Sequence, residues 1–366
     1  MDLSSQLGSL SWLRYFLPIR AGYPIYLLFF ITARCMGKCR HCFYWQELNQ
    51  KKQELSLEEI EKICRGMGRL LQLTITGGEP LLRDDLYQVF EVFYKYNRPF
   101  NLGLATSGYF PEKLEMVCRK VLENLSRSNF TVGLPIEGPP ELNDWIRGVE
   151  GFFGRTQESV KRLQVLKKKY PQLTILIDIT ASADNQEHLE ETYFLVRDQL
   201  KPDLINLIII RGEPREKETL NLKPEKIRKI VKLIEEEVRR GKIAGYGFYS
   251  KLLFAKDNLL RRVGLEIFQG KNPRLRCQAG NLVGVIYPEG KVYPCELLEK
   301  PLGNLRENNY DLPGIWGSAE ARRVREWIKT QECKCYHQCF LSPSLFFDPA
   351  YLPKLFGEYL RLKMRR

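Results

Sequence analysis

Residues 25–42, IYLLFFITARCMGKCRHC, join a continuous apolar run to three closely spaced cysteines. The run, residues 25–32, has the length and the β-branched and aromatic content of a buried strand. Cys35, Cys39 and Cys42 follow it directly, on the loop at the carboxyl end of the strand. Barrel folds build their active sites at that end. The stretch therefore predicts a first parallel strand that leads into a functional loop.

Five further apolar runs alternate with helical patterns along the chain. Ser56 opens one such helix, with Glu59 three residues on as its capping-box partner. Near-continuous apolar strands separated by helices predict a parallel sheet, and right-handed crossovers curl it toward a barrel. We expect an α/β fold, a partial (β/α)6 TIM-like barrel with a small C-terminal domain that contains a β-hairpin. The further strands are expected at 72–76, 100–106, 130–137, 173–180 and 204–211.

The pattern changes after the sixth strand. A less regular stretch leads to VGVIY, a Pro288-Glu289-Gly290 turn and KVYPC, which together predict the hairpin. We expect five parts: an N-terminal extension (1–23), the barrel (24–240), a connecting region (241–276), a cysteine-bearing auxiliary domain (277–340) and a basic amphipathic tail (341–366).

Composition narrows the protein class. The 366 residues carry 57 Lys and Arg against 44 Asp and Glu, a net charge of +13, which favours acidic partners. The longest apolar run is too short for a membrane span, and the first residues do not resemble a signal peptide. The sequence therefore predicts a cytoplasmic protein, whose reducing surroundings would leave its ten cysteines free for metal binding or chemistry.

Cys35, Cys39 and Cys42 are spaced to surround one metal centre. Three thiolates on so short a loop suit a 4Fe-4S cluster that keeps one iron open. A zinc ion with His41 as fourth ligand is the alternative, and incidental thiols are the third. The spacing alone leaves all three open.

The second expected strand ends in Gly77-Gly78-Glu79-Pro80. Two glycines let a backbone approach a ligand closely, and a carboxylate beside them can receive an ammonium group. An ordinary tight turn between strand and helix is the alternative.

Together, the CxxxCxxC loop and the GGEP segment resemble the hallmark of the radical S-adenosylmethionine (SAM) enzymes. The resemblance implies that the three cysteines hold a 4Fe-4S cluster whose open iron binds SAM. It also implies that Gly77, Gly78, Glu79 and Pro80 contact the SAM amino group.

The resemblance implies two further SAM contacts. Ser107, at the end of the third expected strand, matches the position of an assisting Ser or Asn in the family. Residues 133–148 resemble the family's SLDGP…HDxxRG segment, with Pro135 and Glu137 in place of Ser and Asp. Arg147 is kept there, and a structural salt bridge is its alternative role.

The C-terminal cysteines resemble the SPASM and twitch extensions of this family, which carry auxiliary 4Fe-4S clusters. The resemblance implies one auxiliary cluster, and a structural zinc site is the alternative. Between these cysteines, His337 is expected to be an exposed loop residue, and a hydrogen bond that tunes the cluster is its alternative role. Cys64 and Cys118 fall on apolar helix faces and are expected in the core. The five candidate ligands are Cys277, Cys295, Cys333, Cys335 and Cys339.

The resemblance implies an enzyme that cleaves SAM reductively to a 5'-deoxyadenosyl radical and removes hydrogen from a substrate C–H bond. A ribosomally made peptide or protein is the first substrate class, with an electron donor such as flavodoxin or ferredoxin. A lipid at the membrane surface is the second, because apolar residues flanked by basic ones occur near both ends. A non-enzymatic metal-binding module is the third interpretation, and we expect no nucleic-acid partner. The terminal residues, which could instead pack on the barrel, are Leu10, Trp12, Leu13, Phe16, Leu17, Leu355, Phe356, Tyr359, Leu362 and Met364.

Overall fold

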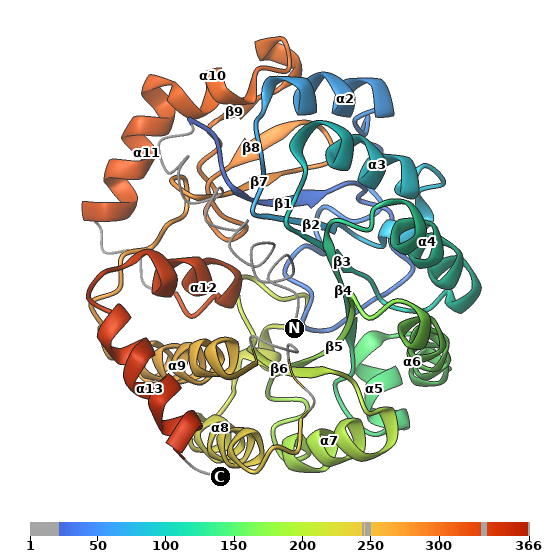
Figure 1. Cartoon of the computed structure of the whole chain (residues 1–366), viewed down its shortest axis with the longest axis vertical. Coiled ribbons are helices and arrows are strands. Elements are labelled where there is room, and N and C mark those ends of the chain that lie inside the picture. Colours follow the sequence, from blue (N-terminus) through green and yellow to red (C-terminus); the bar gives the residue numbers. More distant parts are fainter. Residues whose placement is uncertain (1–21, 244, 246–249, 331–334, 365–366) are drawn as a thin grey trace, which may run out of the picture.

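A computed structural model of the chain describes residues 22–243, 245, 250–330 and 335–364. Its strands form one sheet in the order β6-β5-β4-β3-β2-β1-β7-β8-β9, which curves through the centre of the molecule (Figure 1). All neighbours from β6 to β7 are parallel, so the carboxyl ends of these strands meet at one edge. The partial-barrel fold is therefore confirmed. The first six strands are Tyr26–Phe30 (β1), Gln72–Thr76 (β2), Asn101–Ala105 (β3), Asn129–Pro135 (β4), Leu173–Ala181 (β5) and Leu204–Ile209 (β6).

Helices connect these strands and cover the outer side of the sheet (Figure 1). The Ser56 side chain accepts from the Glu59 backbone N–H and the Glu59 carboxylate accepts from that of Ser56, which confirms the capping box. Cys64 and Cys118 are fully buried on helix faces, as expected. The helices are Leu57–Gly66 (α2), Leu86–Asn97 (α3), Pro111–Asn124 (α4), Pro140–Arg147 (α5), Phe152–Lys169 (α6), Leu189–Leu195 (α7) and Pro224–Arg239 (α8).

The predicted hairpin is present and continues the barrel's own sheet. Strand β7 (Val283–Ile286) pairs in parallel with β1, and β8 (Lys291–Tyr293) returns antiparallel to β7. Gly290 has a φ of +88°, which the turn between them requires. A short strand, β9 (Gly303–Asn304), completes the sheet. The hairpin therefore lies directly beside the first barrel strand.

The connecting region is more regular than expected, because it contains the long helix α9 (Ser250–Phe268). Residues of α9 such as Ala255 and Leu259 pack with the C-terminal helices in a second, smaller core. This partner is distant in sequence, so local periodicity gave little sign of it. The remaining helices are Leu312–Gly317 (α10), Ala319–Thr330 (α11), Gln338–Phe347 (α12) and Leu352–Met364 (α13).

The apolar residues near the C-terminus divide between the core and the surface. Leu355 is buried and Leu362 partly buried, whereas Phe356 and Met364 are 61% and 75% exposed. The N-terminal residues considered with them, 10–17, lie outside the described part of the chain. Among the described residues, none of the helices combines the length and the apolar character needed to cross a membrane.

Candidate functional site

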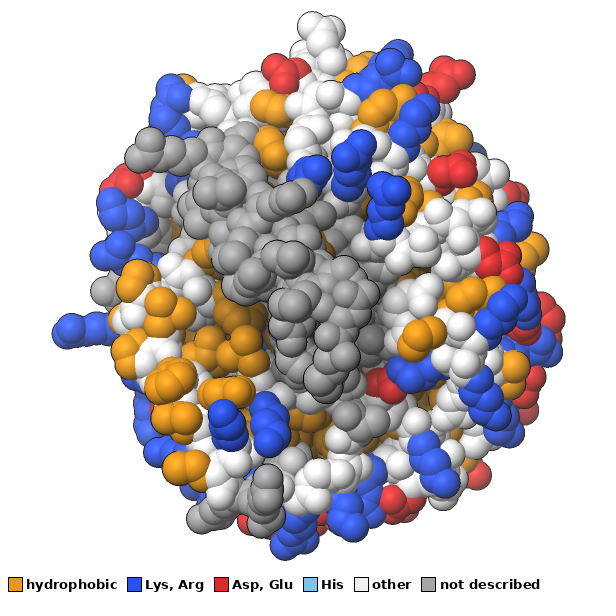
Figure 2. All heavy atoms as spheres, in the orientation of Figure 1, with side chains coloured by type: hydrophobic (Ala, Val, Ile, Leu, Met, Phe, Trp, Pro, Cys, Tyr) orange, Lys and Arg blue, Asp and Glu red, His pale blue; other side chains and the backbone are white. Residues whose placement is uncertain are grey.

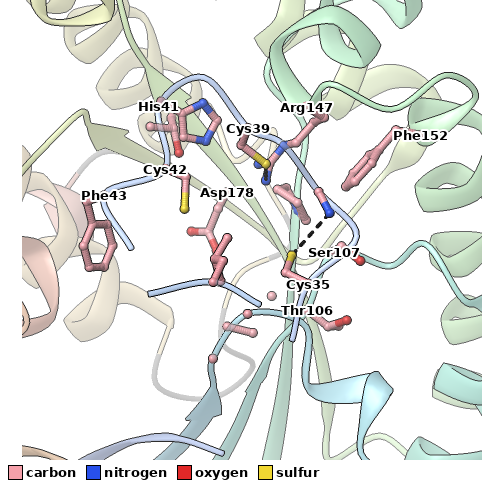
Figure 3. Close-up of a pocket in the computed structure, with 18 of the residues that line it drawn as sticks. Cys35, Cys39, His41, Cys42, Phe43, Thr106, Ser107, Arg147, Phe152 and Asp178 are labelled. Atoms are coloured by element: carbon pink, nitrogen blue, oxygen red, sulfur yellow. Dashed lines mark hydrogen bonds between the residues drawn. The ribbon is translucent and has the colours of Figure 1, made fainter. Parts of the chain in front are cut away.

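The cysteine loop after β1 lies over a cavity of about 240 Å³ at the carboxyl ends of the strands (Figure 3). Cys35, Cys39 and Cys42 all line this cavity. The Cys39 and Cys35 sulfurs lie 3.4 and 3.6 Å from the point where a Cβ atom on Gly37 would stand. The structure thus brings the three predicted ligands together around one space.

Backbone hydrogen bonds fix the loop to its neighbours. The N–H groups of Lys38 and Arg40 donate to the carbonyls of Arg147 and Ile146, at 3.1 and 2.9 Å. On the other side, the N–H of Arg215 donates to the Cys42 carbonyl at 3.1 Å. The loop is therefore held by the end of α5 and by the segment that follows β6.

The number of cavity thiols matches a 4Fe-4S cluster that keeps one iron open. Among the described residues, no group of three or more His, Cys, Asp or Glu side chains is arranged to hold one metal ion. A 4Fe-4S cluster instead offers a separate iron to each thiolate. Burial raises the pKa of Cys35 to about 12 and that of Cys42 to about 11, so a positive centre would be needed to keep them deprotonated.

The glycine pair lets the loops after β1 and β2 touch. A Cβ on Gly77, whose φ is +150°, would stand 2.5 Å from the Thr32 carbonyl oxygen, and one on Gly78 2.3 Å from that of Arg34. In return, the Gly78 N–H donates to Thr32 at 2.8 Å. No side chain fits at either position, so the cavity wall here is bare backbone.

Glu79 is fully buried between the loops after β2 and β3. Its Oε1 accepts from the Leu81 N–H at 2.9 Å and from the Thr106 hydroxyl at 2.6 Å, while Oε2 accepts from the Ser107 N–H at 2.7 Å. Because a carboxylate oxygen has two lone pairs, Oε2 keeps one acceptor position. Pro80 is buried at the start of a short 3-10 turn, Pro80–Leu82, and Ser107 lines the cavity.

Arg147 forms the structural salt bridge considered for it and also lines the cavity. It donates to the two oxygens of the buried Glu137 carboxylate at 2.8 and 2.6 Å, which is a structural ion pair. It also lines the cavity, with its third nitrogen 3.6 Å from the Cys39 sulfur. Glu137, a departure from the family pattern, thus serves as the partner of this arginine.

Four polar residues that line the cavity were missed in the sequence: Thr106, Thr180, Asp178 and Arg211. Asp178 interrupts an apolar strand pattern and Arg211 ends one. A charged residue at such a position was the sequence signal that could have identified them. The Asp178 Oδ1 accepts from the Asn206 side chain at 2.8 Å, and burial raises the pKa of Asp178 to about 6. Figure 3 shows Asp178 on the side of the cavity near Cys42.

The C-terminal cysteines are only partly brought together. Burial raises the pKa of Cys295, and the nearby thiols of Cys335 and Cys277 raise it further. Cys339 instead has Glu296, Arg211 and Asp178 as its charged neighbours, and its side chain is accessible. Cys333 lies outside the described residues.

His337 is buried, and the expectation of an exposed loop residue is wrong. Only 1% of it is accessible, and its Nε2 hydrogen-bonds the Glu296 carboxylate, whose side chain is also buried. The helix that follows, α12, explains the difference: its Gln338 side chain donates to the Leu207 carbonyl of the edge strand β6. This long-range contact draws the segment inward.

Comparison with known proteins matches two family models to this chain. The radical SAM superfamily matches residues 29–196, and the SPASM iron-sulfur cluster-binding domain matches residues 277–340. A cysteine-type anaerobic sulfatase-maturating enzyme of Clostridium novyi (strain NT) is 24% identical over 340 residues, 84% of each chain. An AdoMet-dependent heme synthase of Methanosarcina barkeri (strain Fusaro / DSM 804) is 26% identical over 307 residues, 81% of this chain and 83% of the relative. The solved structure of anSMEcpe with bound AdoMet superposes with a TM-score of 0.60 at 20% identity, over 93% of each chain.

Proposed function

The chain belongs to the radical SAM superfamily and carries a SPASM iron-sulfur domain, and we propose that it modifies a peptide or protein. It is therefore an enzyme that uses SAM and iron-sulfur clusters. When bound, the reduced cluster and SAM supply a 5'-deoxyadenosyl radical that removes a hydrogen atom from a substrate C–H bond. We assign cluster binding to the cavity thiols of Cys35, Cys39 and Cys42.

The single observation that carries the assignment is that the thiol loop and the bare glycine backbone line one cavity. The backbone of Gly77 and Gly78 leaves room for a ligand beside the cluster. The free acceptor position on Glu79 Oε2 is proposed to take the SAM ammonium group. Arg147, held by Glu137, is proposed to face the SAM carboxylate. Ser107 and Pro80 position Glu79 and the backbone around it.

The auxiliary cluster is assigned to the C-terminal cysteines. Cys277, Cys295 and Cys335 are proposed as three of its ligands because the thiols of Cys277 and Cys335 are close enough to raise the pKa of Cys295. The fourth is taken from Cys333 and Cys339. The buried His337 and Glu296 beside them would shield this centre from solvent.

A peptide or protein substrate is supported by the sulfatase-maturating relative, whose name gives a protein as its target. The net charge of +13 suits an acidic peptide. The heme synthase relative favours a second candidate, a carboxylated tetrapyrrole. Both candidates would use the same cavity and the same radical chemistry.

Hydrogen transfer tests the substrate class directly. The holoenzyme is incubated anaerobically with SAM, dithionite and a fully deuterated cell fraction of peptides, tetrapyrroles or lipids. Mass spectrometry then measures deuterium in the 5'-deoxyadenosine that forms. We expect deuterium from the peptide fraction only. Transfer from the tetrapyrrole or the lipid fraction alone would overturn the peptide proposal.

Two partners complete the proposal. A small reduced iron-sulfur or flavin protein, such as ferredoxin or flavodoxin, would supply the electrons.

An anionic membrane surface would contact α13, where Leu352, Phe356 and Met364 are exposed apolar residues next to Lys363. Figure 2 shows hydrophobic side chains gathered on the side of the molecule where α9, α12 and α13 lie. Co-sedimentation with phosphatidylglycerol vesicles, lost in Phe356→Glu, would support the contact, and equal binding of both proteins would contradict it.

A further inference from the structure

Arg211 stands on the cavity wall that the SAM assignment leaves unused. It follows β6, the edge strand of the sheet, whereas Gly77 and Gly78 follow β2. Three strands separate the two positions, yet both line the same cavity. A molecule bound beside the glycines would therefore have Arg211 on a different side of the cavity.

The two cavity arginines differ in how their charge is balanced. Arg147 shares both Glu137 oxygens at 2.8 and 2.6 Å. Arg211 has one carboxylate contact, to Glu296 at 3.5 Å, and that oxygen is already hydrogen-bonded by His337. Its buried Nε has no hydrogen-bond partner among the described residues. Arg211 is thus the less completely paired cation of the cavity.

Packing fixes the place of Arg211. Its guanidinium lies 5.0 Å from the centre of the Phe43 ring, which belongs to the cysteine loop. A Cβ on the next residue, Gly212, would stand 3.0 Å from both Phe43 and Leu297, and its φ is +69°. The segment is therefore wedged between the cysteine loop and the C-terminal hairpin. A guanidinium held in this way loses little freedom when it binds an anion.

We propose that Arg211 binds a carboxylate of the substrate and so selects substrates that carry an acidic group near the reacting carbon. The proposal rests on the function proposed above, because it takes this cavity as the place of reaction. A planar guanidinium forms paired hydrogen bonds with a carboxylate, the geometry that this ligand matches best. The acidic group belongs to a peptide side chain or terminus, or to a carboxylated tetrapyrrole.

Two small probes test the carboxylate preference without knowledge of the substrate. Saturation-transfer NMR on the SAM-loaded holoenzyme, with its clusters oxidised, compares N-acetylaspartate amide with the neutral N-acetylasparagine amide. We expect the wild type to bind the acidic probe roughly tenfold or more tightly. Arg211→Gln should remove that preference. Equal binding of both probes by the wild type would overturn the inference.

Arg215→Gln is the matched control. Arg215 also follows β6 and also stacks on an aromatic ring of the cysteine loop, Trp45, at 5.8 Å, but it does not line the cavity. This variant should keep the preference for the acidic probe. Loss of the preference in both variants would show a general charge effect and contradict a specific role for Arg211.

Peptide display tests carboxylate binding by Arg211 separately from the proposed modification of peptides. A random peptide library selected on the wild-type holoenzyme should gain an Asp or Glu at one position, and selection on Arg211→Gln should not. Enriched peptides without an acidic position would contradict the Arg211 inference alone. Failure to enrich any peptide, with the NMR preference intact, would contradict the peptide proposal while the carboxylate site stands. Binding of coproporphyrin that depends on Arg211 would then identify the tetrapyrrole as the source.

Discussion

The Glu79 carboxylate accepts a 2.7 Å hydrogen bond from the backbone N–H of Ser107. This contact joins the loop after β2 to the loop after β3, and the Thr106 hydroxyl strengthens it with a second bond. Glu79 therefore holds Thr106 and Ser107, which line the cavity, and we propose that its negative charge also attracts the SAM ammonium group. The two roles can be separated by substitution.

Glu79→Gln should weaken SAM binding because it keeps the shape of the side chain and removes the charge. A charge-assisted hydrogen bond contributes about 1.5 to 3 kcal/mol, so we expect a loss of roughly 10- to 150-fold in affinity. Equilibrium dialysis of the anaerobic enzyme measures this change. Thr106→Val, which removes the hydroxyl bonds to Glu79 and from the Gly108 N–H but keeps the Glu79 charge, should lose less. An affinity that stays unchanged in Glu79→Gln would rule out the ammonium contact.

Arg147→Gln should destabilise the protein by about 3 to 5 kcal/mol, because it leaves the buried Glu137 without its partner. Adding Glu137→Gln should restore much of the stability, as measured by the thermal unfolding midpoint. SAM affinity should stay low in the double variant if Arg147 faces the SAM carboxylate. Recovery of both thermal stability and SAM affinity would show that Arg147 has only a structural role.

The ion pair between Glu59 and Arg306 should make stability depend on pH. Hydrogen bonds from Arg306, at 2.7 and 2.9 Å, lower the pKa of Glu59 from 4.5 to about 2. A lowered pKa in the folded state stabilises the protein above pH 4.5, and this stabilisation is lost as the pH falls from about 4.5 to 2. Glu59→Gln should therefore lower stability by about 2 to 3 kcal/mol at pH 7 and by much less near pH 2.

Unfolding midpoints of wild type and Glu59→Gln at pH 7, 4 and 3 check this expectation. Glu58→Gln is the control, because Glu58 lies in the same helical turn and is exposed. A difference between wild type and Glu59→Gln that is the same at every pH would contradict the assigned cause.

The parallel strands and the cysteine loop were predictable because each is encoded in contiguous residues. The run from Ile25 to Ile31 marks β1, and GGEP marks the close approach of backbone that Gly77 and Gly78 now display. Long-range contacts were harder. His337 is buried against Glu296, which lies 41 residues earlier in the chain, and α9 packs with the distant helices α12 and α13. Local sequence patterns do not reveal such long-range partners.

The cavity shows the same difference between local sequence patterns and long-range contacts. Cys35, Cys39 and Cys42 belong to one contiguous motif, so the sequence marked them as candidates and the family resemblance gave them a role. Asp178 and Arg211 come from different strands, and only the curvature of the sheet brings them to the same space. A charged residue within an apolar strand indicates either a structural ion pair or a functional residue. Asp178 and Arg211 both line the cavity.

The iron content of the reconstituted enzyme, measured together with its SAM cleavage, tests the central claim most directly. The wild type should hold about eight irons and form 5'-deoxyadenosine with dithionite, whereas the triple alanine variant at Cys35, Cys39 and Cys42 should hold about four and form none. Cys64→Ala, which changes a buried core thiol, is the control and should keep both properties. Retained SAM cleavage in the triple variant would contradict the account, and one bound zinc in place of the residual iron would contradict the auxiliary cluster.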